Sequence, residues 1–157
     1  MKVKLTSAGL RRVLTGNPWL KREHVAESID PAAEIVDLTR TDGRVVATAA
    51  VAGGDRIALR VLAFGGGGWD FARLEARLRE CRLWRERLFS SADAFRVVAG
   101  EADGIPGLFV DRFGETLVVQ SLTRLWDRRI DDLIAVLRRG FEPECIVLRN
   151  DGSGREY

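Results

Sequence analysis

The sequence predicts an α+β protein made of two small domains with a helix between them. Short β-rich runs separated by turn residues fill residues 1–68. Apolar residues at helical spacing follow over residues 69–94, and residues 95–157 are typical of strands, a helix and a further strand. A chain of 157 residues can hold two such domains, because domains of about 50 to 150 residues are common.

The first elements alternate between strand and helix patterns. Lys2–Leu5 alternates basic and apolar side chains, which predicts an opening strand. Ser7 is a suitable N-cap for a short helix that runs to Leu14, and residues 16–19 (Gly-Asn-Pro-Trp) end it. We expect Trp19 to anchor the core.

Three β-rich runs follow, and together they favour a small barrel or curled sheet. Glu34–Leu38 and Val45–Val51 flank Asp42-Gly43, a strong hairpin signal. Residues 52–55 turn the chain again, and Arg56–Phe64 alternates apolar and basic side chains along a predicted strand.

Basic residues in this first part are candidate RNA contacts. The net charge is +3 over residues 1–69, +1 over residues 70–94 and −2 over residues 95–157, a bias too mild to identify a nucleic-acid-binding protein alone. For Lys21 and Arg22, phosphate contact and simple solvation are both open, because phosphate binding needs only mobile positive charge. Arg56 and Arg60 share one strand face and are candidates for an RNA backbone, with solvation as the alternative.

A helix of about 20 residues begins after a run of glycines. Gly65–Gly68 departs from the dinucleotide fingerprint at Asp70, so we interpret the run as a flexible linker. Asp70 is the expected N-cap. The expected apolar face consists of Phe71, Leu74, Leu78, Cys81, Trp84 and Leu88. The remaining surface mixes arginine and glutamate, which is typical of solvated helix faces and only secondarily of RNA binding.

The most constrained stretch is Arg96–Gln120. Leu108–Val110 and Leu117–Val119 predict strands joined by a tight hairpin turn at residues 113–115. Residues 100–107 hold two acids, three glycines and a proline, which predicts a loop of fixed shape. Apolar spacing then predicts a second helix that ends with a C′ glycine at Gly140, and Cys145–Leu148 predicts another strand.

Several classes of function are excluded by composition. No apolar run approaches the ~20 residues of a membrane span and Met1–Leu10 lacks an apolar segment, so we expect a cytoplasmic protein with no membrane partner. The single histidine, His24, and two distant cysteines, Cys81 and Cys145, predict no metal site, His-based triad or disulfide framework. We expect both cysteines to be small packing residues.

The constrained stretch also carries a recognisable pattern. Arg96, Glu101, Asp103-Gly104-Ile105-Pro106-Gly107 and Asp111-Arg112-Phe113-Gly114 resemble the central segment of the bacterial class I rRNA large-subunit methyltransferases. Residues 16–19 similarly resemble the start of that family's PUA domain. The family consists of S-adenosylmethionine-dependent enzymes that methylate cytosine C5. They are built from a PUA domain, a small EEHEE domain and a C-terminal Rossmann-like catalytic domain.

The resemblance covers essentially the whole chain but only the first half of such a protein. It implies a PUA-like RNA-binding β-barrel at residues 1–68, a linker helix at 69–94 and an EEHEE-like domain at 95–157. Residues 149–151 and 155–157 resemble the family segment that leads into the catalytic domain, so we expect a truncated last strand and an N-terminal fragment. The Rossmann-like domain is expected to be absent.

The function implied is recognition of 23S rRNA within a cytosine-C5 methyltransferase, without catalysis by this chain alone. S-adenosylmethionine is the cofactor of the full-length family, but none of the family's cofactor and catalytic motifs matches here. We therefore expect no catalytic residue, cofactor site or metal in this chain, and a methyltransferase domain as partner in cis or in trans. A freestanding RNA-binding module and a docking module for a separate methyltransferase subunit are the alternatives.

The resemblance gives the constrained stretch a position facing the missing catalytic domain. The residues concerned are Arg96, Glu101, Asp103, Gly104, Pro106, Gly107, Asp111 and Arg112. Structure alone also explains the acids, since Asp103 and Asp111 can accept backbone N–H bonds in a tight loop, with Arg96 or Arg112 as ionic partners. We favour the structural role. An exposed apolar patch beside the loop would favour docking.

Overall fold

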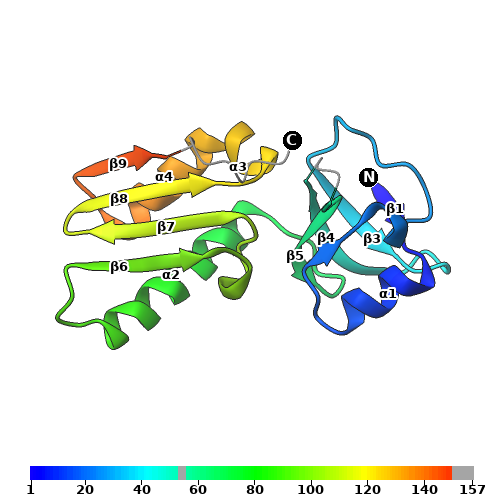
Figure 1. Cartoon of the computed structure of the whole chain (residues 1–157), viewed down its shortest axis with the longest axis horizontal. Coiled ribbons are helices and arrows are strands. Elements are labelled where there is room, and N and C mark those ends of the chain that lie inside the picture. Colours follow the sequence, from blue (N-terminus) through cyan, green and yellow to red (C-terminus); the bar gives the residue numbers. More distant parts are fainter. Residues whose placement is uncertain (53–55, 150–157) are drawn as a thin grey trace. The chain divides into compact units, whose positions relative to one another are not determined.

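The computed structural model describes residues 1–52 and 56–149 and divides them into two compact units, residues 1–69 and residues from 70 onward (Figure 1). Each unit is described by itself. Within the described ranges, no helix combines the length and the apolar character that a membrane span requires.

The first unit is a curled five-stranded sheet with one α-helix. Its elements are β1 (Lys2–Lys4), α1 (Ser7–Leu14), β2 (Trp19–Leu20), η1 (Arg22–His24), β3 (Ile35–Thr39), β4 (Val45–Val51) and β5 (Leu59–Phe64). The strand order is β1-β3-β4-β5-β2, with β1 parallel to β3 and the other pairs antiparallel. Irregular registers after Leu38 and Thr48 bend the strands, as β-bulges do.

Two details of this unit differ from the sequence prediction. The cap of α1 is Thr6, whose hydroxyl oxygen accepts the N–H of Gly9 at 3.1 Å, so Ser7 is the first helical residue. The last strand of this unit begins at Leu59, which leaves Arg56 before the strand, and the carbonyl oxygen of Ala58 accepts the N–H of Ala52 at 2.9 Å. Most of the turn expected at residues 52–55 lies outside the described residues.

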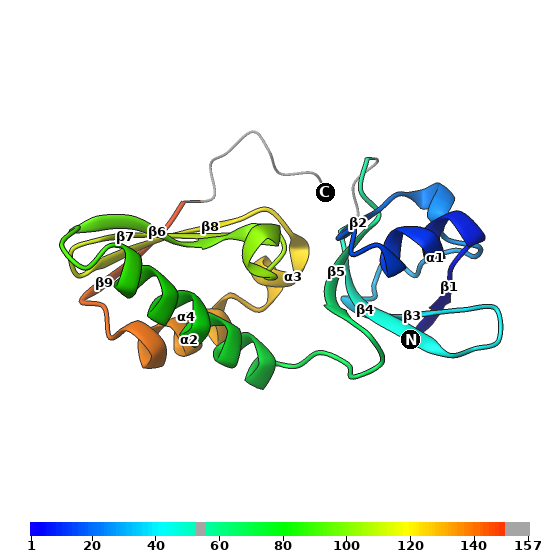
Figure 2. The same cartoon turned by 90° about the horizontal axis from the view of Figure 1, so that it is seen from below.

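The second unit is a four-stranded sheet with helices on one face. Its elements are α2 (Phe71–Leu88), β6 (Ala94–Ala99), η2 (Gly100–Asp103), β7 (Leu108–Phe113), β8 (Thr116–Ser121), α3 (Arg124–Arg128), α4 (Ile130–Phe141) and β9 (Cys145–Leu148). The strand order is β6-β7-β8-β9, and only the β8–β9 pair among these is parallel. Figure 2 shows α2 and α4 on the same face of this sheet.

The helix expected within residues 69–94 is α2. α2 belongs to the second unit, where it packs on β6 and α4 and buries Leu74, Leu78 and Cys81. The apolar face predicted for it is too wide, since Trp84 is 57% and Leu88 56% exposed. The strand β6 was not among the predicted strands. The finer EEHEE assignment depends on residues 150–157, which are outside the described part of the chain.

The predicted second helix divides in two and ends later than expected. Arg129 separates α3 from α4, and α4 continues through Gly140 because Phe141 is buried in the core. Glu142 then takes the left-handed conformation at φ +47°, the position that we expected a glycine to occupy.

Candidate nucleic-acid interface

An exposed tryptophan lies beside an arginine at one edge of the first sheet. Trp19 on β2 is paired directly with Arg60 on β5, and opposite residues of antiparallel strands project to the same face. Trp19 is 45% exposed, whereas its neighbour Leu20 is fully buried. The expectation that Trp19 anchors the core is therefore wrong, because strand alternation gives that position to Leu20.

The backbone of Trp19 is fixed from both sides. Its N–H donates to the Oδ1 atom of Asn17 at 3.0 Å. Its carbonyl oxygen accepts a hydrogen bond from Nε of Arg12 at 3.2 Å, which brings the guanidinium of α1 to this edge. Lys21, two residues beyond Trp19, is exposed. We call Arg12, Trp19, Lys21 and Arg60 the basic-aromatic surface.

His24 supports this surface rather than acting as a base. Its ring is buried, and its Nδ1 atom accepts the N–H of Lys21 at 3.0 Å. Burial, followed by the nearby charge of Arg12, lowers the pKa of His24 below its ordinary value of 6.5, with Glu23 opposing and Lys21 adding to the shift. The neutral imidazole thus holds the Arg22–His24 turn in place.

The other predicted RNA contacts are distributed differently. Arg22 is exposed, and its guanidinium donates to the carbonyl oxygen of Val25 at 3.2 Å. Arg56 is also exposed but precedes β5, so strand alternation does not align it with Arg60 as expected. Arg12 was missed because its role comes from the contact between α1 and β2, which local periodicity does not reveal.

In the second unit, the motif loop is organised around Asp103. This buried carboxylate accepts the N–H of Ala99 at 2.7 Å. Its two oxygens also accept hydrogen bonds from Nη2 of Arg85, at 2.8 and 2.7 Å. The carbonyl oxygen of Asp103 accepts from Nε of Arg77 at 2.6 Å. Asp103 therefore accepts a backbone bond as expected, but its ionic partner is Arg85 of α2.

The glycines of the motif loop allow close packing that a side chain would prevent. Gly104 and Gly107 have φ of +69° and +70°. A Cβ atom on Gly107 would lie 2.5 Å from the side chain of Thr123. The carbonyl oxygen of Pro106 accepts the indole N–H of Trp126 at 2.8 Å, which ties the loop to α3. Glu101 lies half-buried in η2.

Arg96 and Asp111 form a cross-strand ion pair on the sheet. They are register partners on β6 and β7, and the guanidinium donates to both carboxylate oxygens at 2.8 and 3.0 Å. The same guanidinium lies over the ring of Phe109, 5.2 Å from its centroid. The hydrogen bond to Asp111 raises the pKa of Arg96 above its ordinary value.

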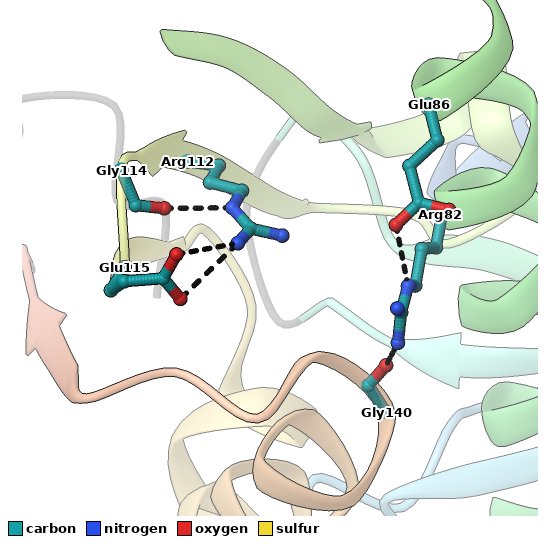
Figure 3. A network of polar contacts seen from close by, with 6 residues as sticks. All are labelled: Arg82, Glu86, Arg112, Gly114, Glu115 and Gly140. Carbon is teal, nitrogen blue, oxygen red and sulfur yellow. Dashed lines mark hydrogen bonds and ion pairs between the residues drawn. The ribbon is translucent and has the colours of Figure 1, made fainter. Parts of the chain in front are cut away.

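Arg112 is held by its own hairpin turn. It donates to the carbonyl oxygen of Gly114 at 2.7 Å and to the Glu115 carboxylate at 3.3 and 3.4 Å (Figure 3). Figure 3 also shows Arg82 of α2 between Glu86 and the carbonyl oxygen of Gly140. Of the two arginines expected as ionic partners of the acids, Arg96 pairs with Asp111, whereas Arg112 binds residues of its own hairpin turn.

The sheet face opposite α2 and α4 carries apolar side chains around the Arg96–Asp111 pair. Residue pairing places Val118 beside Asp111 and Val147 beside Val118. Phe113 is 56% and Val147 44% exposed. We call Phe109, Phe113, Val118 and Val147 the sheet patch; it is the kind of apolar patch that favours docking.

The described residues offer little for covalent or metal chemistry. Among residues 1–52 and 56–149, no cluster of three or more metal-ligating side chains is found. Cys81 is buried, and burial, followed by the charge of Asp103, raises the pKa of its thiol. Cys145 is exposed, so only Cys81 is the packing residue that we expected.

The first unit matches a known domain class. Residues 3–64 match the family model of the PUA-like domain, which covers β1 through β5. The curled sheet of the first unit agrees with that match.

Over 94% of its length, the chain is homologous to ribosomal RNA large subunit methyltransferase I. The protein of that name from Cronobacter sakazakii is 33% identical over 154 residues, and the one from Escherichia coli O127:H6 is also 33% identical. The chain spans 39% of the length of each of these relatives.

Solved structures share the fold at low sequence identity. A structure described as a SAM-dependent methyltransferase from Streptococcus mutans superimposes with a TM-score of 0.81 at 13% identity, covering 95% of this chain and 41% of that one. A second, described as a methyltransferase complexed with SAH, gives 0.83 at 13% identity, covering 95% and 40%.

Proposed function

We propose that this chain is the RNA-recognition part of a SAM-dependent 23S rRNA cytosine-C5 methyltransferase. It binds RNA through the first unit and does not transfer a methyl group by itself. The observation that carries the proposal is the exposed Trp19 beside Arg60 on a PUA-like domain. The names of the homologues support rRNA as the substrate class.

The chemistry of the basic-aromatic surface suits a single-stranded or irregular RNA segment. An exposed indole offers a stacking platform for an unpaired base, and adjacent guanidinium groups contact phosphates. Lys21 and Arg22 extend the positive charge beyond Trp19, while Arg56 is a separate exposed charge. The mild charge of the chain predicts weak binding that depends on salt.

The test is RNA binding by fluorescence anisotropy with a labelled 23S rRNA fragment at several salt concentrations. We expect Trp19→Ala to weaken binding about tenfold, the loss of one base–aromatic stack. Arg60→Ala should weaken binding and reduce the slope of log K against log salt by about one. The matched control is Arg44→Ala, six residues along β4 from the Arg60 partner Ala50, or about 20 Å away.

Two outcomes contradict the proposal. Absence of RNA binding by the wild-type chain at low salt removes the RNA-recognition function. Equal losses in Trp19→Ala and Arg44→Ala remove the assigned surface.

Catalytic incompetence has its own test. Incubation of the chain with radiolabelled S-adenosylmethionine and 23S rRNA should leave the rRNA unlabelled, and calorimetric titration with S-adenosylmethionine should give no heat of binding. Label in the rRNA, or heat of binding, would overturn this part of the proposal. The freestanding-module alternative predicts the same results, and the mass of the native gene product separates the two.

The sheet patch supports a second candidate function, docking of a methyltransferase domain in cis or in trans. The patch is apolar and surrounds the Arg96–Asp111 ion pair, whose two charges compensate each other, which suits a protein partner better than RNA. The motif residues around Arg96 would then face that domain, as the resemblance implies. In size-exclusion chromatography, Phe113→Asp should abolish co-elution with the remaining part of the Cronobacter relative expressed separately, while Phe64→Asp, an equally exposed site in the first unit, should not.

A further inference from the structure

A cavity of about 340 Å³ lies between α2 and the motif loop, within the second unit. It is lined by Arg77, Glu80, Cys81, Trp84, Arg85 and Asp103. The hydrogen bonds from Arg77 and Arg85 to Asp103 join α2 to the motif loop beside this cavity. The cavity therefore lies at the surface of the unit, between α2 and Asp103 of the motif loop.

Trp84 forms the open side of this cavity. Its side chain is 57% exposed near the C-terminal end of an 18-residue helix, although a tryptophan has more apolar surface to bury than any other side chain. Helical spacing places the exposed Arg87 one turn after Trp84 and the exposed Arg73 three turns before it on the same stripe. An aromatic plane flanked by mobile positive charge is the arrangement that binds unpaired bases.

The acids in the cavity do not repel a nucleic acid strongly. Glu80 is paired with Arg77 at 2.6 Å, and Asp103 is paired with Arg85 at 2.7 Å, so each negative charge has an arginine as its ionic partner. Cys81 at the base of the cavity has a thiol pKa raised by burial, which keeps it neutral and unreactive. The cavity is suited to binding and not to covalent chemistry.

We propose that Trp84 and this cavity bind one unpaired RNA base, with the base stacked on the indole and Arg87 contacting its phosphate. The inference rests on the proposed function in that RNA is the ligand, but it assigns a second contact on the other unit. Each unit then offers one aromatic contact for an unpaired base.

The test compares variants of the full chain in anisotropy titrations with a labelled twelve-nucleotide oligocytidine and with an RNA duplex of the same length. We expect Trp84→Ala to lose about tenfold in affinity for the single strand and less than twofold for the duplex. Trp84→Phe should retain most of the affinity because it keeps a ring, whereas Trp84→Leu should behave like Trp84→Ala. The matched control is Leu83→Ala, since Leu83 is 50% exposed on the same helix but does not line this cavity.

Outcomes that overturn the inference differ from those that overturn the proposed function. If Trp84→Ala binds the single strand within twofold of wild type while Trp19→Ala binds more weakly, the contact proposed at Trp84 is wrong and the contact proposed at Trp19 is retained. If Trp84→Leu binds like wild type, the side chain is an apolar contact for a protein and not a base platform. If the wild-type chain binds no RNA at low salt, both proposals fall together. Because Trp84 is exposed, far-ultraviolet circular dichroism should show all variants folded.

Discussion

Removal of the Asp103 carboxylate should destabilise the second unit more than any other single change to its surface charges. In Asp103→Ala, Arg85 loses both of its bonds to the carboxylate and the N–H of Ala99 loses its acceptor. The side chains of Arg85 and Asp103 are only 15% and 11% exposed, so water replaces these bonds poorly. Breaking a buried pair by removing one partner costs about 3–5 kcal/mol. Because the Arg85–Asp103 pair is still slightly exposed, we expect the free energy of unfolding to fall by an amount near the lower end of this range, about 3 kcal/mol.

Urea unfolding followed by hydrogen exchange of β7 and β8 peptides measures this loss in the second unit alone. A loss of about 3 kcal/mol corresponds to a fall in Tm of roughly 12–24 °C for a unit of this size. The matched control is Glu80→Ala, because the Arg77–Glu80 pair is 47% and 64% exposed and should contribute less than about 1 kcal/mol. A loss below about 1 kcal/mol in Asp103→Ala, or equal losses in the two variants, would refute the reasoning.

Two further predictions concern packing and pH. Gly107→Ala should lower the free energy of unfolding by about 2 kcal/mol, because the new Cβ would lie 2.5 Å from the side chain of Thr123 in a left-handed backbone. Its control is Gly114→Ala, at φ +56° with open space around it. In the same urea titration, this variant should lower the free energy of unfolding by about 1 kcal/mol or less. The pKa of His24 is lower in the folded than in the unfolded chain, so the unfolded chain takes up the proton first and stability should fall as the pH drops below about 6.5. The melting temperature of the first unit should therefore fall between pH 7.5 and pH 5 in the wild type, and this fall should be absent in His24→Gln. A wild-type melting temperature that does not depend on pH would contradict the prediction.

The predictable parts of the fold are those set by local sequence. The strands β3, β4, β7, β8 and β9 and the turn at Gly114 follow from alternation and turn chemistry, and the Asp70 cap accepts the N–H of Arg73 as expected. The strand β6 was not predicted because the turn residues of the loop directly after it dominate that stretch of the sequence. In α2, helical spacing alone assigned Trp84 to the apolar face, but the facing surface of β6 and α4 is narrower than the predicted stripe.

The candidate site was less predictable because it depends on pairing between distant segments. Lys21, Arg22 and Arg60 were identified as basic residues on exposed elements, but the exposure of Trp19 depends on which face β2 presents. The bond from Arg12 to the carbonyl oxygen of Trp19 depends on how α1 packs. In the motif loop, the sequence indicated that Asp103 accepts a backbone N–H, yet its partner Arg85 lies 18 residues earlier on another element.

The bond from Arg82 to the carbonyl oxygen of Gly140 has a consequence for how the second unit assembles. A carbonyl group in the last turn of a helix usually finds its partner within a few residues, whereas here the donor lies 58 residues earlier in the chain. The last turn of α4 therefore gains a hydrogen-bond donor when α2 packs beside it. The stability of the α4 C-terminus is thereby coupled to the packing of α2.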